Sequence, residues 1–262
     1  MELEAIQMLW IGEKLSPIEQ LSIRSFLANG HPVHLYVYED VIGIPEGTTV
    51  LNANEIIPSN QIFKFLGSYA AFADLFRWKL LLDKGGYYSD MDVICIKPFR
   101  FQCDIIVGWE QNGTLLTPTI MKFPAKSPLV EIMYNSAKYP LKIFRHDNWK
   151  VILKKLYYFL TRKEMKAIGW GECAGPLALS RAYFYYQYNK KIIPLDSDVF
   201  YPIYWTKVKK FIEPDAISID SLPKSTHAVH LWNEVWKREG MDKNKRYASN
   251  TLLGELFNKY YK

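Results

Sequence analysis

Two aspartates separated by one residue, Asp90 and Asp92, follow a glycine turn at Gly85-Gly86. If residues 87–96 are extended, their side chains alternate between two faces, so both carboxylates project to the same side. Neighbouring carboxylates repel each other unless a cation lies between them, and hard divalent cations prefer oxygen ligands. We therefore predict that the pair binds Mn²⁺ or Mg²⁺, and that the ion holds a diphosphate and neutralises it as a leaving group.

A second charged pair, Asp74 and Arg77, lies on the helix expected from Ser68 to Lys84. This helix is apolar on nearly all sides and is therefore predicted to be buried. Buried charges need partners, and residues three apart lie on neighbouring faces of a helix. A diphosphate leaving group held by a metal ion is the chemistry that a nucleotide-sugar needs. Two interpretations therefore stay open for this pair: an internal ion pair, or two side chains that reach the sugar of such a donor.

The elements that position these residues alternate between strands and helices. The first strand, helix and second strand have the spacing of a parallel βαβ unit, and no repeat or linker divides the chain. We therefore predict the α/β class and one domain. The expected strands are 6–11, 33–38, 93–96, 105–109 and 228–232, and the expected helices are 16–28, 68–84, 128–136, 149–166 and 176–188.

The composition argues against a membrane-spanning, a secreted and a disulfide-rich protein. The 262 residues contain no run of about 18 apolar residues, and the N-terminus has no basic run followed by an apolar block. Three cysteines without paired spacing indicate neither a zinc site nor a disulfide framework. A cytoplasmic protein is expected.

Much of the net charge of +6 lies between Arg145 and Lys166. The segment 149–166 is interpreted either as a basic amphipathic helix that rests on an anionic membrane or as a solvated charged face. Because no nucleic-acid-binding motif accompanies it, we expect no nucleic-acid partner.

Residues 67–98 resemble the DXD sugar-binding region of glycosyltransferase family 32. The pattern is an alanine-rich helix, Asp, two apolar residues, Arg, and then Gly-Gly-x-Tyr-x-Asp-x-Asp-Val. That family contains yeast mannosyltransferases, α-1,4-galactosyltransferases and bacterial polysaccharide enzymes, and the pattern is also similar to the glucosylating domains of large clostridial toxins. The resemblance implies a single GT-A domain over 1–262. A Rossmann-like sheet with flanking helices over 1–110 would bind the nucleotide-sugar, and 111–262 would form a helical acceptor part and a C-terminal closing segment.

The same resemblance implies roles for individual residues. Asp74 and Arg77 would contact the sugar hydroxyls and phosphate of the donor, Asp90 would reach ribose, sugar or metal-bound water, and Asp92 would ligate the metal. Tyr88 would also contribute to donor binding. Where the family often has serine before the helix aspartate, this chain has Ala73, so one polar contact is absent.

Weaker resemblances to the same family lie near both ends of the chain. Leu9-Trp10-Ile11-Gly12 resembles an I-W-x-G strand end whose tryptophan stacks on the nucleotide base, which implies a base site at Trp10 and Leu9; a core tryptophan is the alternative. The segment 230–236 is similar to H-x-W-x-x-S-W, although this chain has Val235 in place of serine. There His230 would complete the metal shell or touch the diphosphate, and Trp232 would cover it.

Gly175 echoes a T-G-P turn that opens a helix beside the donor, where a helix N-terminus would favour an anion. A plain turn is the alternative.

The resemblance implies a retaining glycosyltransferase that moves a hexose or N-acetylhexosamine from a nucleotide-diphosphate sugar, with UDP favoured. The acceptor would be a hydroxyl of a glycan or a lipid-linked glycan in surface polysaccharide synthesis, with the enzyme in the cytoplasm or peripheral on the inner membrane face. The alternative is a non-catalytic nucleotide-sugar or carbohydrate-binding module of the same fold.

Overall fold

The computed structural model describes residues 2–161 and 172–261. The chain forms two compact units, each assembled from separate stretches of sequence. Unit 1 comprises Met1–Asn52, Ser89–Gln102 and Asp196–Lys262, and unit 2 comprises Ala53–Tyr88 and Cys103–Leu195. Helices and strands alternate in both, which confirms the α/β class. The expected single domain stays a prediction, and neither unit ends at the expected internal boundary at residue 110.

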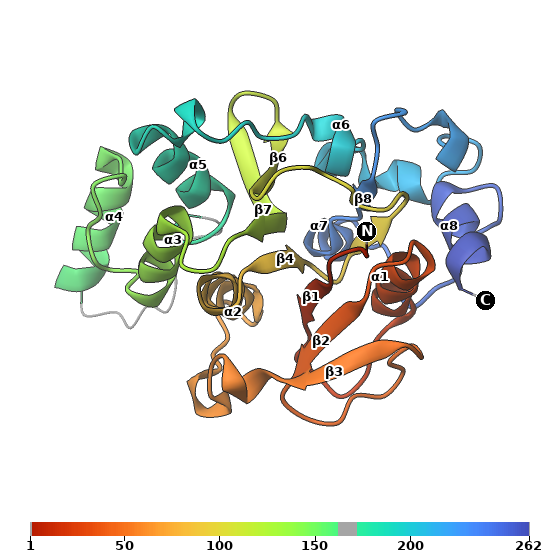
Figure 1. The fold of residues 1–262 in the computed structure, drawn as a ribbon, viewed down its shortest axis with the longest axis horizontal. Coiled ribbons are helices and arrows are strands. Elements are labelled where there is room, and N and C mark those ends of the chain that lie inside the picture. The colour runs from red at the N-terminus through yellow and green to blue at the C-terminus, as the bar shows by residue number, and fades with distance from the viewer. Residues whose placement is uncertain (1, 162–171, 262) are drawn as a thin grey trace. The chain divides into compact units, whose positions relative to one another are not determined.

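Unit 1 begins with three parallel strands in the order β3, β2, β1 (Figure 1). They are β1 (Ile6–Leu9), β2 (Val33–Val37) and β3 (Thr48–Asn52), and the helix α1 (Pro17–Ala28) connects the first two. The fully buried run of β1 and the parallel register of Ile6 with Val33 confirm the predicted βαβ unit.

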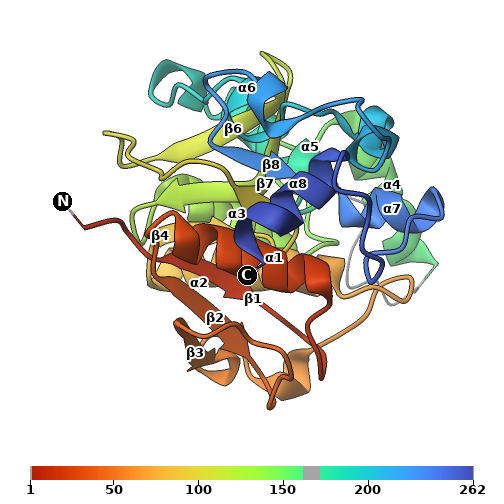
Figure 2. The same cartoon turned by 90° about the vertical axis from the view of Figure 1, so that its right-hand side faces the viewer.

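Helix α1 begins where the sequence predicts. Pro17 occupies its first position, and the backbone N–H of Ser16 donates to Glu19 Oε2 at 2.7 Å. Its buried face packs against α8 (Leu252–Tyr260), which lies beside it in Figure 2. The first and last segments of the chain therefore share one core.

A short antiparallel pair completes the strands of unit 1. It joins β5 (Val93–Cys95) to β8 (Ala228–His230), and α6 (Ser197–Phe200) and α7 (Asn233–Arg238) flank β8 in the sequence. The predicted extended run over 87–96 is wrong: β4 ends at Ser89, and the chain turns at Met91 and Asp92 before β5. Asp90 and Asp92 therefore lie between two strands, and strand alternation does not determine where their side chains point. The position of Asp92 depends instead on β5, which pairs with β8.

Unit 2 contains three strands in the order β4, β7, β6, with β6 and β7 antiparallel. Helix α2 packs against α3, and α5 packs against β7. The elements are α2 (Ala70–Asp83), β4 (Gly86–Ser89, whose last residue belongs to unit 1), β6 (Ile106–Gln111), β7 (Leu115–Phe123), α3 (Pro128–Lys138), α4 (Trp149–Leu160) and α5 (Pro176–Tyr185).

Three outcomes in unit 2 differ from the sequence prediction. Strand β7 was not predicted, because Pro118 within it argues against a strand. Helix α2 begins after Tyr69, although Ser68 Oγ still accepts the N–H of Ala70 at 3.2 Å. The described part of the helix predicted over 149–166 ends at Leu160, and 162–166 lie outside the described residues.

Across the described ranges, no helix is both long enough and apolar enough to cross a membrane.

The end of α2 depends on a glycine. Gly85 has φ +67, in the left-handed region, and its N–H donates to the carbonyl of Leu81 at 3.0 Å. A Cβ at this position would lie 2.4 Å from the backbone nitrogen of Ala125. The predicted glycine stop therefore also permits close backbone contact that any other residue would prevent.

We expect Gly85→Ala to destabilise the protein by about 3 kcal/mol, since it adds a backbone clash to the ~1 kcal/mol cost of a left-handed non-glycine residue. Urea unfolding measures the difference. Gly67→Ala is the control: Gly67 has φ +81, but a Cβ added there would meet no atom within 4 Å, so this variant isolates the conformational cost. Equal losses for the two variants would show that the close contact at Gly85 is unimportant.

Candidate functional site

The pairing of β5 with β8 brings Asp92 to the start of α7. Val93 is in register with His230, and the Leu231 N–H donates to the Asp92 carbonyl at 2.9 Å. The Asp92 carboxylate lies 3.3 Å from His230 Nε2. Its Oδ2 also accepts the backbone N–H of Asn233 at 2.8 Å. Two predicted site residues, Asp92 and His230, are thus in direct contact.

The surroundings of Asp92 keep its carboxyl group ionised. Burial by itself would raise its pKa, but the charge of His230 and hydrogen bonds from His230 and the Asn233 amide outweigh burial, and the pKa lies below the usual value. The side chains of Asp92 and His230 are only 13% and 9% exposed. Unit 1 therefore holds a fixed negative charge that water screens weakly.

Two buried polar atoms beside this carboxylate have no hydrogen-bond partner among the described residues. They are His230 Nδ1 and Asn233 Oδ1. Buried polar atoms are nearly always paired, so these two atoms are candidates for contact with a ligand. Asn233 was not predicted as a site residue. The available signal was its place directly after Trp232, in the same segment as His230.

The backbone of Trp232, between His230 and Asn233, has a strained conformation. Its φ of +61 is in the left-handed region, which is unfavourable for a tryptophan. The indole N–H donates to the Ile203 carbonyl at 2.8 Å, and the ring centroid lies 4.1 Å from that of His230. The buried ring therefore packs beside His230, and its predicted cover over the diphosphate stays a prediction.

The donor atoms near Asp92 suit a hard divalent cation. Mg²⁺ and similar ions are commonly held by one or two carboxylates, with substrate phosphates and water completing the shell. Asp92 offers an ionised carboxylate and Asn233 an unpaired amide oxygen. His230 offers Nδ1 when the ring is neutral and its proton is on Nε2, which faces Asp92. Within residues 2–161 and 172–261, no three His, Cys, Asp or Glu side chains are grouped to hold a metal. A shell built on Asp92 thus needs oxygen atoms from other groups.

Asp90 lies just before the turn that leads to Asp92, and its side chain is partly buried. The hydroxyl of Ser89 donates to the Asp90 carbonyl at 3.1 Å. Its predicted role at the metal or the donor stays a prediction.

Trp10 follows β1 and is partly exposed. The Lys243 ammonium lies 5.4 Å from its ring centroid and 2.8 Å from Glu19 Oε1. The indole N–H has no acceptor in the described part of the chain. Trp10 is therefore not enclosed in the core, whereas Leu9 is 7% exposed and packs there. The predicted base contacts of both residues remain untested.

In unit 2, Asp74 and Arg77 form the predicted ion pair. Arg77 Nη2 lies 3.4 Å from Asp74 Oδ1, and Arg77 Nη1 donates to the Pro118 carbonyl at 2.6 Å. The guanidinium also stacks 5.0 Å from the ring centroid of Tyr88, which is buried. Burial raises the pKa of Asp74, and the charge of Arg77 lowers it in part. The internal ion pair is confirmed, and the predicted donor contacts of these residues and Tyr88 stay predictions.

Gly175 is the N-cap residue of α5 and is buried. The carbonyl of its neighbour Ala174 accepts the indole N–H of Trp78 at 2.7 Å. The predicted helix start is confirmed, and anion binding there remains untested.

Two family models match the chain. Residues 27–113 match the glycosyltransferase sugar-binding region containing the DXD motif, and residues 173–260 match the alpha 1,4-glycosyltransferase conserved region. Asp92 lies in the first match, and His230 and Asn233 lie in the second. The chain is related to the DXD-containing glycosyltransferases. The resemblance seen in the sequence is therefore confirmed, and the β5–β8 pair joins its two conserved regions.

Individual glycosyltransferases are also similar to this chain. Lactosylceramide 4-alpha-galactosyltransferase of Rattus norvegicus is 26% identical over 196 residues, which is 72% of this chain and 46% of the relative. The chain thus spans about half the length of that relative.

Among solved structures, the PaToxG glycosyltransferase is 17% identical with a TM-score of 0.46, covering 70% of this chain and 69% of its own. The glycosyltransferase GlyE of Streptococcus pneumoniae TIGR4 is 13% identical with a TM-score of 0.43, covering 99% and 64%.

We expect Arg77→Met to destabilise the protein by about 3 kcal/mol, because it leaves the Asp74 carboxylate and the Pro118 carbonyl without their cation. Thermal or urea unfolding measures the loss. The double variant Asp74→Asn/Arg77→Met should recover part of it, since the uncompensated charge is then removed.

Lys79→Met is the matched control on the same helix. Lys79 pairs with Asp83 at 2.7 Å, with both side chains about a third exposed, and such pairs contribute less than about 1 kcal/mol. If Arg77→Met costs no more than Lys79→Met, the ion pair of Asp74 and Arg77 is not a structural requirement.

Proposed function

We propose that this chain is a metal-dependent, retaining glycosyltransferase of the GT-A type. It transfers a hexose or N-acetylhexosamine from a nucleotide-diphosphate sugar, with UDP as the favoured nucleotide. The observation that carries the proposal is the ionised Asp92 carboxylate, held between His230 and the Asn233 amide where the two conserved regions meet.

In this proposal, Asp92 and the amide oxygen of Asn233 hold Mn²⁺ or Mg²⁺, and His230 completes the shell or touches the diphosphate. Bound there, the ion would neutralise the charge that develops on the leaving diphosphate. The Asn233 backbone amide fixes one oxygen of Asp92, which leaves the carboxylate pre-oriented. Asp90 contacts ribose, sugar or metal-bound water.

The base of the donor stacks on Trp10. The support is a partly exposed indole whose N–H lacks an acceptor among the described residues, and which already lies near the cation of Lys243. A purine or uracil base could replace part of that contact, since aromatic rings bind bases by stacking.

Retention requires that the acceptor hydroxyl attack from the face that the diphosphate leaves. The leaving phosphate can take the hydroxyl proton, so no separate catalytic base is needed. Asp92 already accepts hydrogen bonds from His230 and the Asn233 amide, which would make it a poor base.

The acceptor is a hydroxyl of a glycan or of a lipid-linked glycan, in surface polysaccharide synthesis at the cytoplasmic face of a membrane. The name of the rat relative includes lactosylceramide, a glycolipid, which favours a lipid-linked acceptor.

Nucleotide release from UDP- and GDP-sugars tests the proposal. With Mn²⁺, we expect release from one donor, and a chelator should abolish it. Asp92→Asn should lower the rate by at least about 100-fold, and Asn233→Ala by about 10- to 100-fold, since removal of a ligand or its support has effects of this size. Both variants should also bind Mn²⁺ more weakly, as measured by electron paramagnetic resonance without donor.

Asp83→Asn is the control, because Asp83 is an exposed carboxylate paired with Lys79. Its rate and Mn²⁺ affinity should match those of the unaltered protein. Unchanged turnover in Asp92→Asn would refute the metal assignment. Donor binding without release, even with glycan acceptors present, would instead favour a non-catalytic binding module.

A further inference from the structure

Helix α4 of unit 2 turns its apolar side away from the protein. Only Val151 and Lys155 are buried among its 12 residues. Six of its large apolar side chains are between 41% and 76% exposed, and at 100° per residue they fall on one side of the helix. This outward stripe consists of Trp149, Leu153, Leu156, Tyr157, Phe159 and Leu160.

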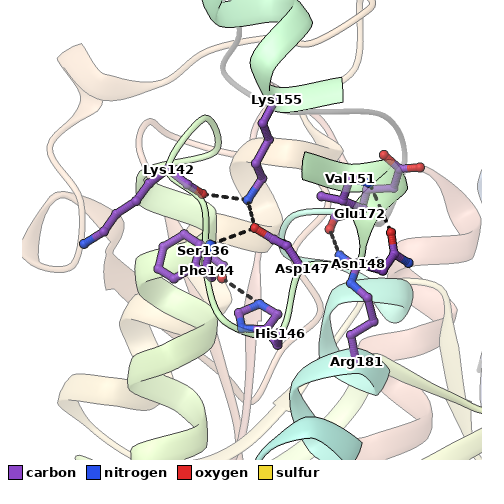
Figure 3. Close-up of polar contacts among 10 residues, drawn as sticks. All are labelled: Ser136, Lys142, Phe144, His146, Asp147, Asn148, Val151, Lys155, Glu172 and Arg181. Carbon is purple, nitrogen blue, oxygen red and sulfur yellow. Dashed lines mark hydrogen bonds and ion pairs between the residues drawn. The ribbon is translucent and has the colours of Figure 1, made fainter. Parts of the chain in front are cut away.

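A buried ion pair fixes this orientation. Figure 3 shows Lys155 pointing inward, where its ammonium lies 2.6 Å from Asp147 Oδ2 and donates to the Lys142 carbonyl at 2.7 Å. The side chains of both ion-pair partners are 2% exposed. Asp147 Oδ2 also accepts the N–H of Phe144 at 2.8 Å. Rotating the helix to bury the stripe would separate this pair, so the exposed stripe follows from the packing of α4.

The start of α4 is fixed as well. Asn148 caps the helix, and its side chain accepts the N–H of Val151 at 3.1 Å (Figure 3). Asp147 and Asn148 lie on the loop just before the helix, and their partners Lys155 and Val151 lie on its first two turns. The stripe is thus presented by a helix that is anchored at its beginning.

The stretch of sequence that contains α4 is positively charged. Between residues 138 and 161 the only acidic residue is Asp147, which is buried and paired. Six basic residues lie in the same stretch, namely Lys138, Lys142, Arg145, Lys150, Lys154 and Lys155. Lys155 is used internally and Lys154 pairs with Glu172 at 2.8 Å, while the other four are exposed.

We propose that α4 lies in the headgroup layer of a membrane that contains anionic lipids. Its stripe of aromatic residues and leucines faces the acyl chains. Exposed Lys150 on the helix, with Lys142 and Arg145 on the loop before it, contacts lipid phosphates, and such apolar and basic residues are typical of interfacial helices. A helix of this length spans about 18 Å, too short to cross a hydrocarbon core of about 30 Å. Because Lys155 is buried, it is not one of the membrane contacts. The proposal does not depend on the transfer reaction.

Co-sedimentation with phosphatidylcholine vesicles, with and without phosphatidylglycerol, tests the proposal. The full chain should bind the anionic vesicles, and added salt should weaken binding. The triple variant Leu153→Gln/Phe159→Gln/Leu160→Gln should bind about 100-fold more weakly, because three apolar side chains no longer enter the membrane. Lys150→Gln should bind anionic vesicles about five-fold more weakly.

The matched control is Ile42→Gln/Val50→Gln/Ile193→Gln, which removes three other exposed apolar side chains and should bind as the unaltered chain does. Thermal unfolding should be unchanged in both triple variants. Failure of the full chain to bind anionic vesicles, or equal binding by the two triple variants, would overturn the proposal.

Light scattering tests whether a second copy of this chain, rather than a membrane, covers the stripe. If the full chain is a dimer and the α4 triple variant a monomer, the stripe is a subunit interface and the membrane proposal is wrong. Donor release without vesicles should be the same in the α4 variant and the unaltered chain. The two proposals can therefore fail separately.

Discussion

The antiparallel pairing of β5 with β8 is the contact on which the candidate site depends. It joins segments whose hydrogen-bonded residues, Asp92 and Asn233, are 141 positions apart in the sequence. Helix α1 fastens the pair, because Ser22 Oγ donates to the Val93 carbonyl at 2.6 Å and Ser25 Oγ accepts the Cys95 N–H at 2.8 Å. A shift by one residue would exchange the faces of β8 and move His230 away from Asp92.

Asp74, Asp92 and Asp147 each have a basic partner and side chains that are at most 20% exposed, but their surroundings differ. Asp147 is matched by Lys155 and the Phe144 amide, and the ammonium of Lys155 also has a carbonyl acceptor. This pair is satisfied by the protein itself, as a structural pair should be. The contact of Asp92 with His230 instead has unpaired polar atoms around it. Unpaired polar atoms on both sides of this carboxylate are the reason for proposing a ligand there.

The pair of Asp74 and Arg77 lies between these cases. Arg77 is held by a carbonyl and an aromatic ring as well as by the aspartate, whereas its buried Nε has no hydrogen-bond partner among the described residues. The raised pKa of Asp74 shows that Arg77 compensates its burial only in part. The ion pair of Asp74 and Arg77 does not test their predicted contacts with a donor.

Much of the fold followed from local patterns. Ser16 and Pro17 set the start of α1, and Gly85 set the end of α2, because capping and left-handed conformations depend on a few neighbouring residues. Strand β7 was missed because Pro118 is unusual within a strand, and the turn at Asp92 was missed because three-residue strands are too short to show alternation.

The sequence by itself determined the α/β class and the relationship to DXD glycosyltransferases, and it identified Asp92 as a candidate site residue. Only the tertiary structure decided which groups surround that aspartate, that Asn233 is among them, and that α4 turns leucines outward and Lys155 inward. The physical reason is the range of the interactions. Caps, turns and periodicity act over a few residues, whereas strand pairing and buried ion pairs depend on the partners that packing brings together.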